Sequence, residues 1–246
     1  MFGLVPGAKA QVNPERDWRT IRTERFYIHY TPELEHVARR AAVQAESAYV
    51  ALSTFMKPPR GKIDVIIGDN VDMPNGYATA IPSNRIGIYA TPPVFESALR
   101  FTDDHLQLVL THELAHIFHL DRAGGWWGAA QKLFGRYPFF FPNIYHPTWI
   151  IEGLATYYES RITGAGRVVG SEHQMIARSA ALAHRFARID QLSQANPEFP
   201  YGYSVYAYGS LFMDYLARAH GDSAMEQFVA ASSRRILPWS LNGPAK

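Results

Sequence analysis

The chain of 246 residues contains no cysteine, which excludes disulfide bonds and zinc sites built on thiolates. It also lacks any run of about 18 consecutive apolar residues, so we expect no integral membrane segment. Neither sign of charge is in excess. The net charge of +2 gives no reason to expect nucleic acid or an anionic membrane as a partner. No internal repeat is visible.

What is present fits an ordinary globular protein. The apolar content of 47% and the charged content of 19% are those of a chain with a sizeable core. The length suits one large domain or two small lobes. We expect a single domain over residues 17–236, with a sheet lobe over 17–102 and a helical lobe over 103–236.

The two ends have a different character. Residues 1–16 have no hydrophobic stretch of the kind found in signal peptides, yet Ala8-Lys9-Ala10-Gln11 resembles a signal-peptidase cleavage site. We therefore interpret this segment as an amino-terminal remnant derived from a signal peptide. Residues 237–246 read as a linker toward a further domain.

Hydrophobic periodicity divides the chain into strands followed by helices. The expected strands are Arg25–Thr31, Lys62–Gly68, Gly76–Ala80 and Arg85–Thr91. The expected helices are 32–56, 103–120, one beginning at Thr148, 171–188, 204–220 and 222–234, with a turn-rich loop at 69–74 and irregular structure at 121–147. This order predicts an α+β fold in which a small mixed sheet precedes a helical lobe.

The helix at 103–120 carries the sequence His112-Glu113-Leu114-Ala115-His116, an HExxH motif. Residues four apart lie on one face of a helix, so both imidazoles can reach one metal ion. Zinc binds such nitrogens readily, and the neighbouring Glu113 carboxylate can deprotonate an attacking water. The apolar residues around the motif predict a buried helix, where two histidines and a glutamate without partners would be costly. A shared zinc ion removes that cost.

A catalytic zinc usually has a third protein ligand, and two patterns compete for it. The HExxHxxGxxH pattern fails, because Arg122 stands at the third histidine position and His119 stands at the glycine. The alternative is Glu152, which lies on an apolar stretch where a lone carboxylate needs a reason to be present. The null interpretation of Glu152 is a buried ion pair with an arginine.

HExxH followed by Trp149-Ile150-Ile151-Glu152-Gly153-Leu154-Ala155-Thr156-Tyr157-Tyr158-Glu159 resembles the gluzincin metallopeptidases, and most of all the peptidase MA-like bacterial proteins. The resemblance is strongest over residues 103–160. It implies a zincin-like fold with the active-site helix between the lobes. It also implies one Zn²⁺ per chain on His112, His116 and Glu152, with Glu113 as general base. The implied substrate is a peptide or protein.

The resemblance also implies an extracytoplasmic location and a further C-terminal domain, often a β-propeller. This chain departs from gluzincin aminopeptidases in two ways. Thirty-five residues lie between His116 and Glu152, and no Gly-Ala-Met-Glu-Asn-like segment precedes the motif. We therefore expect a metalloendopeptidase. The alternatives are a zinc hydrolase of a non-peptide substrate and a catalytically idle metal-binding scaffold.

The same resemblance implies two further parts of the site. An edge strand should lie beside the cleft, where an extended peptide could add as another strand, and Arg85–Thr91 is the candidate. A tyrosine on a helix after the glutamate should stabilise the oxyanion. Tyr206 matches that position best and Tyr208 second, whereas the null interpretation of each is a core aromatic.

The sequence allows more than one role for several polar and aromatic residues. A metal-bound histidine usually donates its second nitrogen to an acceptor, and Thr156, Glu159 and Asp121 are candidates. His119 can be an outer neighbour of the site, an alternative ligand or a satisfied core histidine. The aromatic residues of 121–147 can line a substrate pocket, dock a partner domain or form a structural lid.

Overall fold

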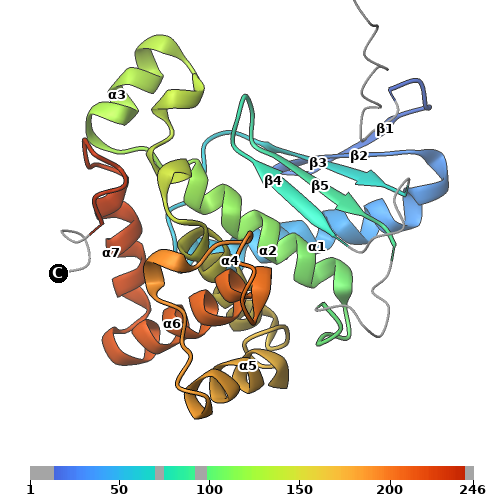
Figure 1. Cartoon of the computed structure of the whole chain (residues 1–246). Helices are drawn as coiled ribbons and strands as arrows, with labels where there is room; N and C mark the ends of the chain where they lie inside the picture. The colour runs from blue at the N-terminus through green and yellow to red at the C-terminus, as the bar shows by residue number, and fades with distance from the viewer. Residues whose placement is uncertain (1–13, 70–74, 92–98, 242–246) are drawn as a thin grey trace, which may run out of the picture.

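The computed structural model describes residues 14–69, 75–91 and 99–241, so most of the expected loop at 69–74 and most of the amino-terminal segment lie outside it. Strands occupy the first part of the chain and helices the second (Figure 1). The predicted α+β class, with a small mixed sheet and a helical lobe, is thereby confirmed. None of the helices in the described ranges is both long and apolar enough to cross a lipid bilayer.

The sheet has five strands in the order β1-β2-β3-β5-β4. Their bounds are β1 Arg19–Arg22, β2 Phe26–Tyr30, β3 Ile63–Gly68, β4 Gly76–Thr79 and β5 Arg85–Tyr89. The two central pairings, β2 with β3 and β3 with β5, are parallel, and the outer two are antiparallel. Alternate residues of β2 and β3 are fully buried, because successive side chains of a strand point to opposite faces.

The edge strand next to the helical lobe is β4, so the prediction that Arg85–Thr91 forms this edge is wrong. The hairpin of β4 and β5 places β5 against β3, and β4 lies outside it. The sequence of a hairpin does not show which of its two strands will pair with the rest of the sheet. Here β5 pairs with β3, and this pairing leaves β4 at the edge.

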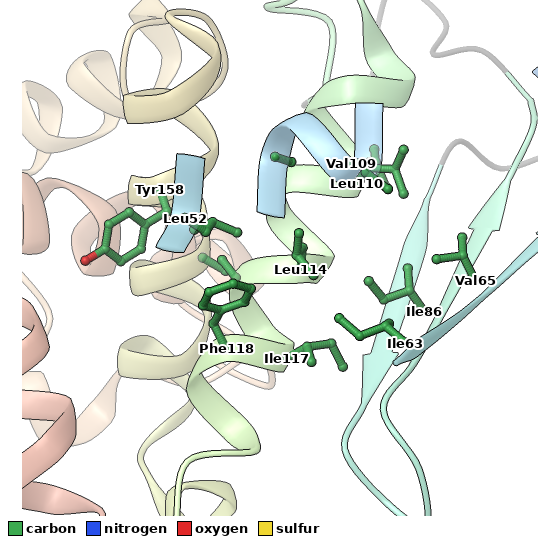
Figure 2. Close-up of a cluster of buried hydrophobic side chains, with 14 of the residues drawn as sticks. Leu52, Ile63, Val65, Ile86, Val109, Leu110, Leu114, Ile117, Phe118 and Tyr158 are labelled. Carbon is green, nitrogen blue, oxygen red and sulfur yellow. The ribbon is translucent and has the colours of Figure 1, made fainter. Parts of the chain in front are cut away.

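Two helices pack against the sheet. The alanine-rich helix α1, Glu35–Ser53, contacts β2, and α2, His105–Leu120, contacts β4 and β5. The Asp104 carboxylate caps α2 by accepting a hydrogen bond of 3.1 Å from the Gln107 amide, which has no partner within the helix. Figure 2 shows side chains of α2 pointing toward the sheet on one side and toward Tyr158 on the other. The motif helix is therefore buried from both sides.

The helical lobe consists of α4 Thr148–Thr163, α5 Ser171–Leu182, α6 Ser204–His220 and α7 Asp222–Ser232. α4 packs on α2 and also on α6. The α4–α6 crossing is very close, because a Cβ atom added to Gly153 would lie only 2.5 Å from the carbonyl carbon of Gly209. Both crossing positions therefore require glycine.

Two expectations about the helical half are wrong. Residues 121–147 are not irregular throughout, since they form α3, Gly125–Phe134, and two short 3-10 helices, Pro138–Phe140 and Pro142–Tyr145. The glycines of α3 have a low helix propensity, so the sequence gives little indication of this helix. A 2.6 Å hydrogen bond from Trp127 Nε1 to the Arg235 carbonyl joins α3 to the segment after α7. The helix predicted over 171–188 ends at Leu182, where the chain turns through a left-handed His184 with a φ of 51°.

Candidate metal centre

The two histidines of the motif face each other from successive turns of α2. Their Nε2 atoms are 3.1 Å apart, and each residue is 7% exposed. Two unprotonated imidazole nitrogens at this distance direct their lone pairs at each other, which is unfavourable unless a cation or a proton lies between them. The helix thus builds two donor atoms of a metal site from local geometry alone.

The third donor comes from α4. Glu152 Oε2 lies 3.5 Å from His112 Nε2 and 3.4 Å from His116 Nε2. Ligand bonds of about 2.0–2.1 Å in a tetrahedral zinc site place the donor atoms about 3.3 Å from one another. The three measured separations match that edge length. Two imidazoles and a carboxylate are also the donor types that zinc prefers, so these residues fit the ion.

The ionisation of this group depends on hydrogen bonds between the histidines and the carboxylates. Burial opposes ionisation of Glu152, but hydrogen bonds to His112 and His116 outweigh it and lower the pKa of the carboxyl. Burial also opposes a charge on His112, but hydrogen bonds to Glu152 and Glu159 outweigh it and raise the pKa of its imidazole to about 9. Protons and a metal ion therefore compete for the same acceptors, as expected for histidine and carboxylate ligands.

Glu113 lies on the same helix, beneath the edge strand. A Cβ atom added to Gly76 of β4 would be 2.9 Å from Glu113 Cγ and 3.0 Å from its Oε1. Glu113 is 5% exposed, and burial raises the pKa of its carboxyl. A carboxylate with a raised pKa accepts a proton more readily near neutral pH than an exposed one does.

His112 has a defined neighbour on its other nitrogen. Glu159 Oε2 lies 2.8 Å from His112 Nδ1, and Glu159 is fully buried. An acceptor here favours the tautomer with hydrogen on Nδ1, which leaves Nε2 free to bind metal. Of the three acceptors considered from the sequence, the structure places Glu159 at this nitrogen.

The other two acceptor candidates lie elsewhere. Asp121 forms ion pairs with Arg60 at 3.0 Å and with Arg136 at 2.7 Å. Within the described residues, neither Thr156 Oγ1 nor His116 Nδ1 has a hydrogen-bond partner. Asp121 therefore serves to tie the segment after α2 to neighbouring loops.

Tyr206 of α6 borders the centre. The Arg167 guanidinium carbon lies 4.9 Å from the centre of the Tyr206 ring, and the Tyr206 hydroxyl accepts a 3.1 Å hydrogen bond from Gln194 Nε2. Burial and the nearby negative charge of Glu152 raise the pKa of Tyr206 to about 12. The phenol is therefore protonated at neutral pH and can donate a hydrogen bond.

The second tyrosine candidate points away. Tyr208 packs against Phe186, with ring centroids 5.5 Å apart. Both residues line an apolar pocket of about 320 Å³ together with Trp149 and Phe212. Tyr208 thus belongs to a partly exposed hydrophobic cluster outside the main core.

His119 is not part of the metal group. Its Nε2 lies 3.0 Å from His146 Nδ1, and its carbonyl accepts a hydrogen bond from Asn143 Nδ2. Burial lowers the pKa of both imidazoles, that of His146 to about 4, so the pair is neutral at physiological pH. In the described part of the chain the group of potential metal ligands consists of His112, His116 and Glu152.

One residue of this centre carries no signal in the sequence. Arg167 contacts Glu159, His112 and Tyr206, but it stands in a short loop between α4 and α5. Because it lies in a loop, no helical or strand periodicity relates it to the motif residues. Only the folded loop reveals it.

Comparisons with known proteins bear on the fold. No protein-family model matches the chain, and no curated protein matches it either. Among solved structures, native yeast LTA4 hydrolase is similar, with a TM-score of 0.51 and 16% identity over 87% of this chain and 33% of that chain. Yeast LTA4 hydrolase in complex with bestatin gives a TM-score of 0.51 and 17% identity over 93% of this chain and 35% of that one. The chain therefore spans about a third of the yeast protein, and the likeness establishes a shared fold.

Proposed function

We propose that this protein is a zinc-dependent hydrolase and, within that class, a metalloendopeptidase of gluzincin type. The observation that carries the proposal is the triangle of His112 Nε2, His116 Nε2 and Glu152 Oε2, with sides of 3.1, 3.4 and 3.5 Å. Three protein donors leave a fourth tetrahedral position for water or substrate, which is the arrangement of a catalytic zinc site.

Bound zinc supplies a Lewis acid that polarises the scissile carbonyl and lowers the pKa of water. Glu113, whose pKa is raised by burial, accepts a proton from the attacking water and passes it to the leaving amine. Tyr206 is protonated at neutral pH and donates its hydroxyl hydrogen to the oxyanion as charge develops there. Glu159 holds the His112 ring in its metal-binding orientation.

The position of β4 favours a peptide over other substrates. β4 is an edge of the sheet and passes directly over Glu113. The Tyr89 amide donates to the Asn75 carbonyl, so these two residues form a hydrogen-bonded pair between the strands. Successive residues of a strand direct their main-chain groups to opposite sides. Ala78, three residues after Asn75, therefore directs its amide away from β5. An extended peptide can add to this edge through main-chain hydrogen bonds and so lie across the general base.

Two wider predictions rest on the resemblance to peptidase MA-like proteins. They are an extracytoplasmic location and a further C-terminal domain such as a β-propeller. Large apolar side chains are exposed around α3 and after α7, at Trp126, Leu133, Phe134, Phe139, Ile236 and Trp239. These exposed apolar side chains support the proposal of a docking partner in this region.

The test compares wild type with Glu113→Gln on a mixture of unfolded proteins, with zinc content measured in both. The amide keeps the size of the side chain but cannot act as a base, so we expect cleavage to fall by about 10²–10⁴-fold with one zinc per chain retained. Glu24→Gln is the matched control, because Glu24 is 75% exposed in the sheet lobe. Zinc binding without cleavage by wild type would favour a non-peptide substrate or an idle scaffold.

A further inference from the structure

The loop after α4 folds back against the end of its own helix. α4 ends at a left-handed Gly164, and Gly166, with a φ of 87°, reverses the chain. A Cβ atom at Gly166 would lie 2.9 Å from Leu108 Cδ1 and 3.1 Å from Glu159 Oε1. Only glycine permits this close return, and its effect is to bring Arg167 into the interior, where it is 7% exposed.

Arg167 binds the Glu159 carboxylate through three hydrogen-bond donors. Its Nε lies 2.9 Å from Oε1, its Nη2 lies 2.6 Å from Oε2, and its backbone amide lies 3.3 Å from Oε1. Burial alone would raise the pKa of Glu159, but the charge and hydrogen bonds of Arg167 lower it to about 2. The fork of two parallel bonds fixes the plane of the carboxylate that His112 faces.

A buried ion pair of this kind is weak evidence for a role in stability. Replacing such a pair by apolar residues of similar volume is often neutral, because both charges lose their hydration on burial. The pair therefore calls for another explanation. Its geometry supplies one, because Glu159 presents the same oxygen, Oε2, to Arg167 and to His112 Nδ1.

Arg167 also has a second face. Its guanidinium carbon lies 4.9 Å from the centre of the Tyr206 ring, which is within cation–π range. The guanidinium thus bonds to Glu159 and lies over the ring of Tyr206. Its Nη2 also lies 2.9 Å from His112 Nδ1, so a displaced arginine would change the surroundings of this ring directly.

We propose that Arg167 is a positioning residue that holds the His112 ring through Glu159 and the Tyr206 phenol through stacking. One guanidinium then sets both the metal affinity and the alignment of the oxyanion donor. The alignment of Tyr206 for catalysis rests on the proposed function. The effect of Arg167 on metal affinity through His112 does not depend on catalysis.

The experiment measures two readouts in Arg167→Met and wild type. The first is zinc affinity by competition with a chromophoric chelator, together with the visible spectrum of the cobalt-substituted protein. We expect affinity to fall about 10–100-fold, the effect usual for a lost outer neighbour of a metal ligand, and the cobalt bands to shift. The second is hydrolysis, where we expect kcat to fall with little change in KM. Arg161→Met is the matched control, since Arg161 is a half-exposed arginine of α4 paired with Asp222.

Arg167→Lys covers the case in which Arg167→Met does not fold. Lysine keeps the charge beside Glu159 but loses the fork and the planar stacking surface. We expect zinc affinity within about threefold of wild type and kcat about tenfold lower. Wild-type affinity, cobalt spectrum and kcat in a folded Arg167→Met, or a wild-type cobalt spectrum and kcat in Arg167→Lys, would overturn the proposal. If wild type binds zinc but hydrolyses nothing, the proposed function fails, and the affinity and cobalt spectrum alone decide whether Arg167 positions His112.

Discussion

Replacing Gly153 by alanine tests how Glu152 is brought to the two histidines of the candidate metal centre. Gly153 follows Glu152 on α4 and lies against Gly209 of α6. An added Cβ would meet three backbone atoms of Gly209, at 2.5, 2.7 and 2.8 Å. Backbone atoms cannot rotate aside as a side chain can. The two helices must therefore separate.

The magnitude follows from these distances. Ordinary contact begins at 3.4 Å, so α4 and α6 have to move apart by roughly 1 Å. Overpacking costs about 1–3 kcal/mol, and the rigid neighbours place Gly153→Ala at the upper end. The better helix propensity of alanine offsets about 1 kcal/mol of this. The net loss is about 2 kcal/mol, which lowers Tm by roughly 4–8 °C in a chain of this size.

The assay is thermal unfolding of the metal-free protein, followed by zinc titration. Gly128→Ala is the matched control, because Gly128 is also helical and its added Cβ would come no closer than 3.1 Å to any atom outside its helix. We expect Gly128→Ala to lower Tm by much less than Gly153→Ala, because the Ala123 carbonyl oxygen at 3.1 Å has to move by only a few tenths of an ångström. Gly153→Ala should also bind zinc more weakly, since Glu152 moves with α4. Equal Tm values for the two variants would refute the inferred contact between α4 and α6.

Three further predictions concern other parts of the molecule. Asp104→Ala removes the cap on the Gln107 amide and the bonds that Arg40 and Gln44 donate to the same carboxylate, and should lower the free energy of unfolding in urea by about 1–2 kcal/mol. The exposed Asp103→Ala should change it by less than about 0.5 kcal/mol. Glu159 has a pKa of about 2 in the folded protein against 4.5 ordinarily, so its contribution to stability is complete above pH 4.5 and is lost as the pH falls through 2. Glu159→Gln should therefore have a flatter dependence of unfolding free energy on pH in that window, although it is less stable at pH 7; an equal slope in both proteins would contradict this. Ala78→Pro removes an amide of β4 that is directed away from β5, and should raise KM for an unfolded polypeptide about fivefold with zinc binding unchanged. An unchanged KM would argue against strand addition at β4.

Local features of the sequence predicted a large part of this structure. The spacing of His112 and His116 places both rings on one helical face whatever the rest of the chain does. The limits of α6 agree with the predicted 204–220, and α2 ends at Leu120 as the predicted helix 103–120 does. The strand β1 was not predicted, because its sequence RTIR lies on an exposed edge and has no buried alternation. Helix α3 was also missed, since its glycines weaken the local signal.

The sequence by itself determined the chemical groups of the centre: the donor types, a glutamate beside them and a second helix able to carry a carboxylate. The tertiary structure decided which groups meet there. Glu152 reaches the histidines because α4 packs between α2 and α6, and Arg167 reaches Glu159 because a glycine turn returns the chain. Likewise β4 became the edge because β5 docked on β3. Periodicity acts over a few residues, whereas these contacts join residues far apart in the chain and depend on how whole elements pack.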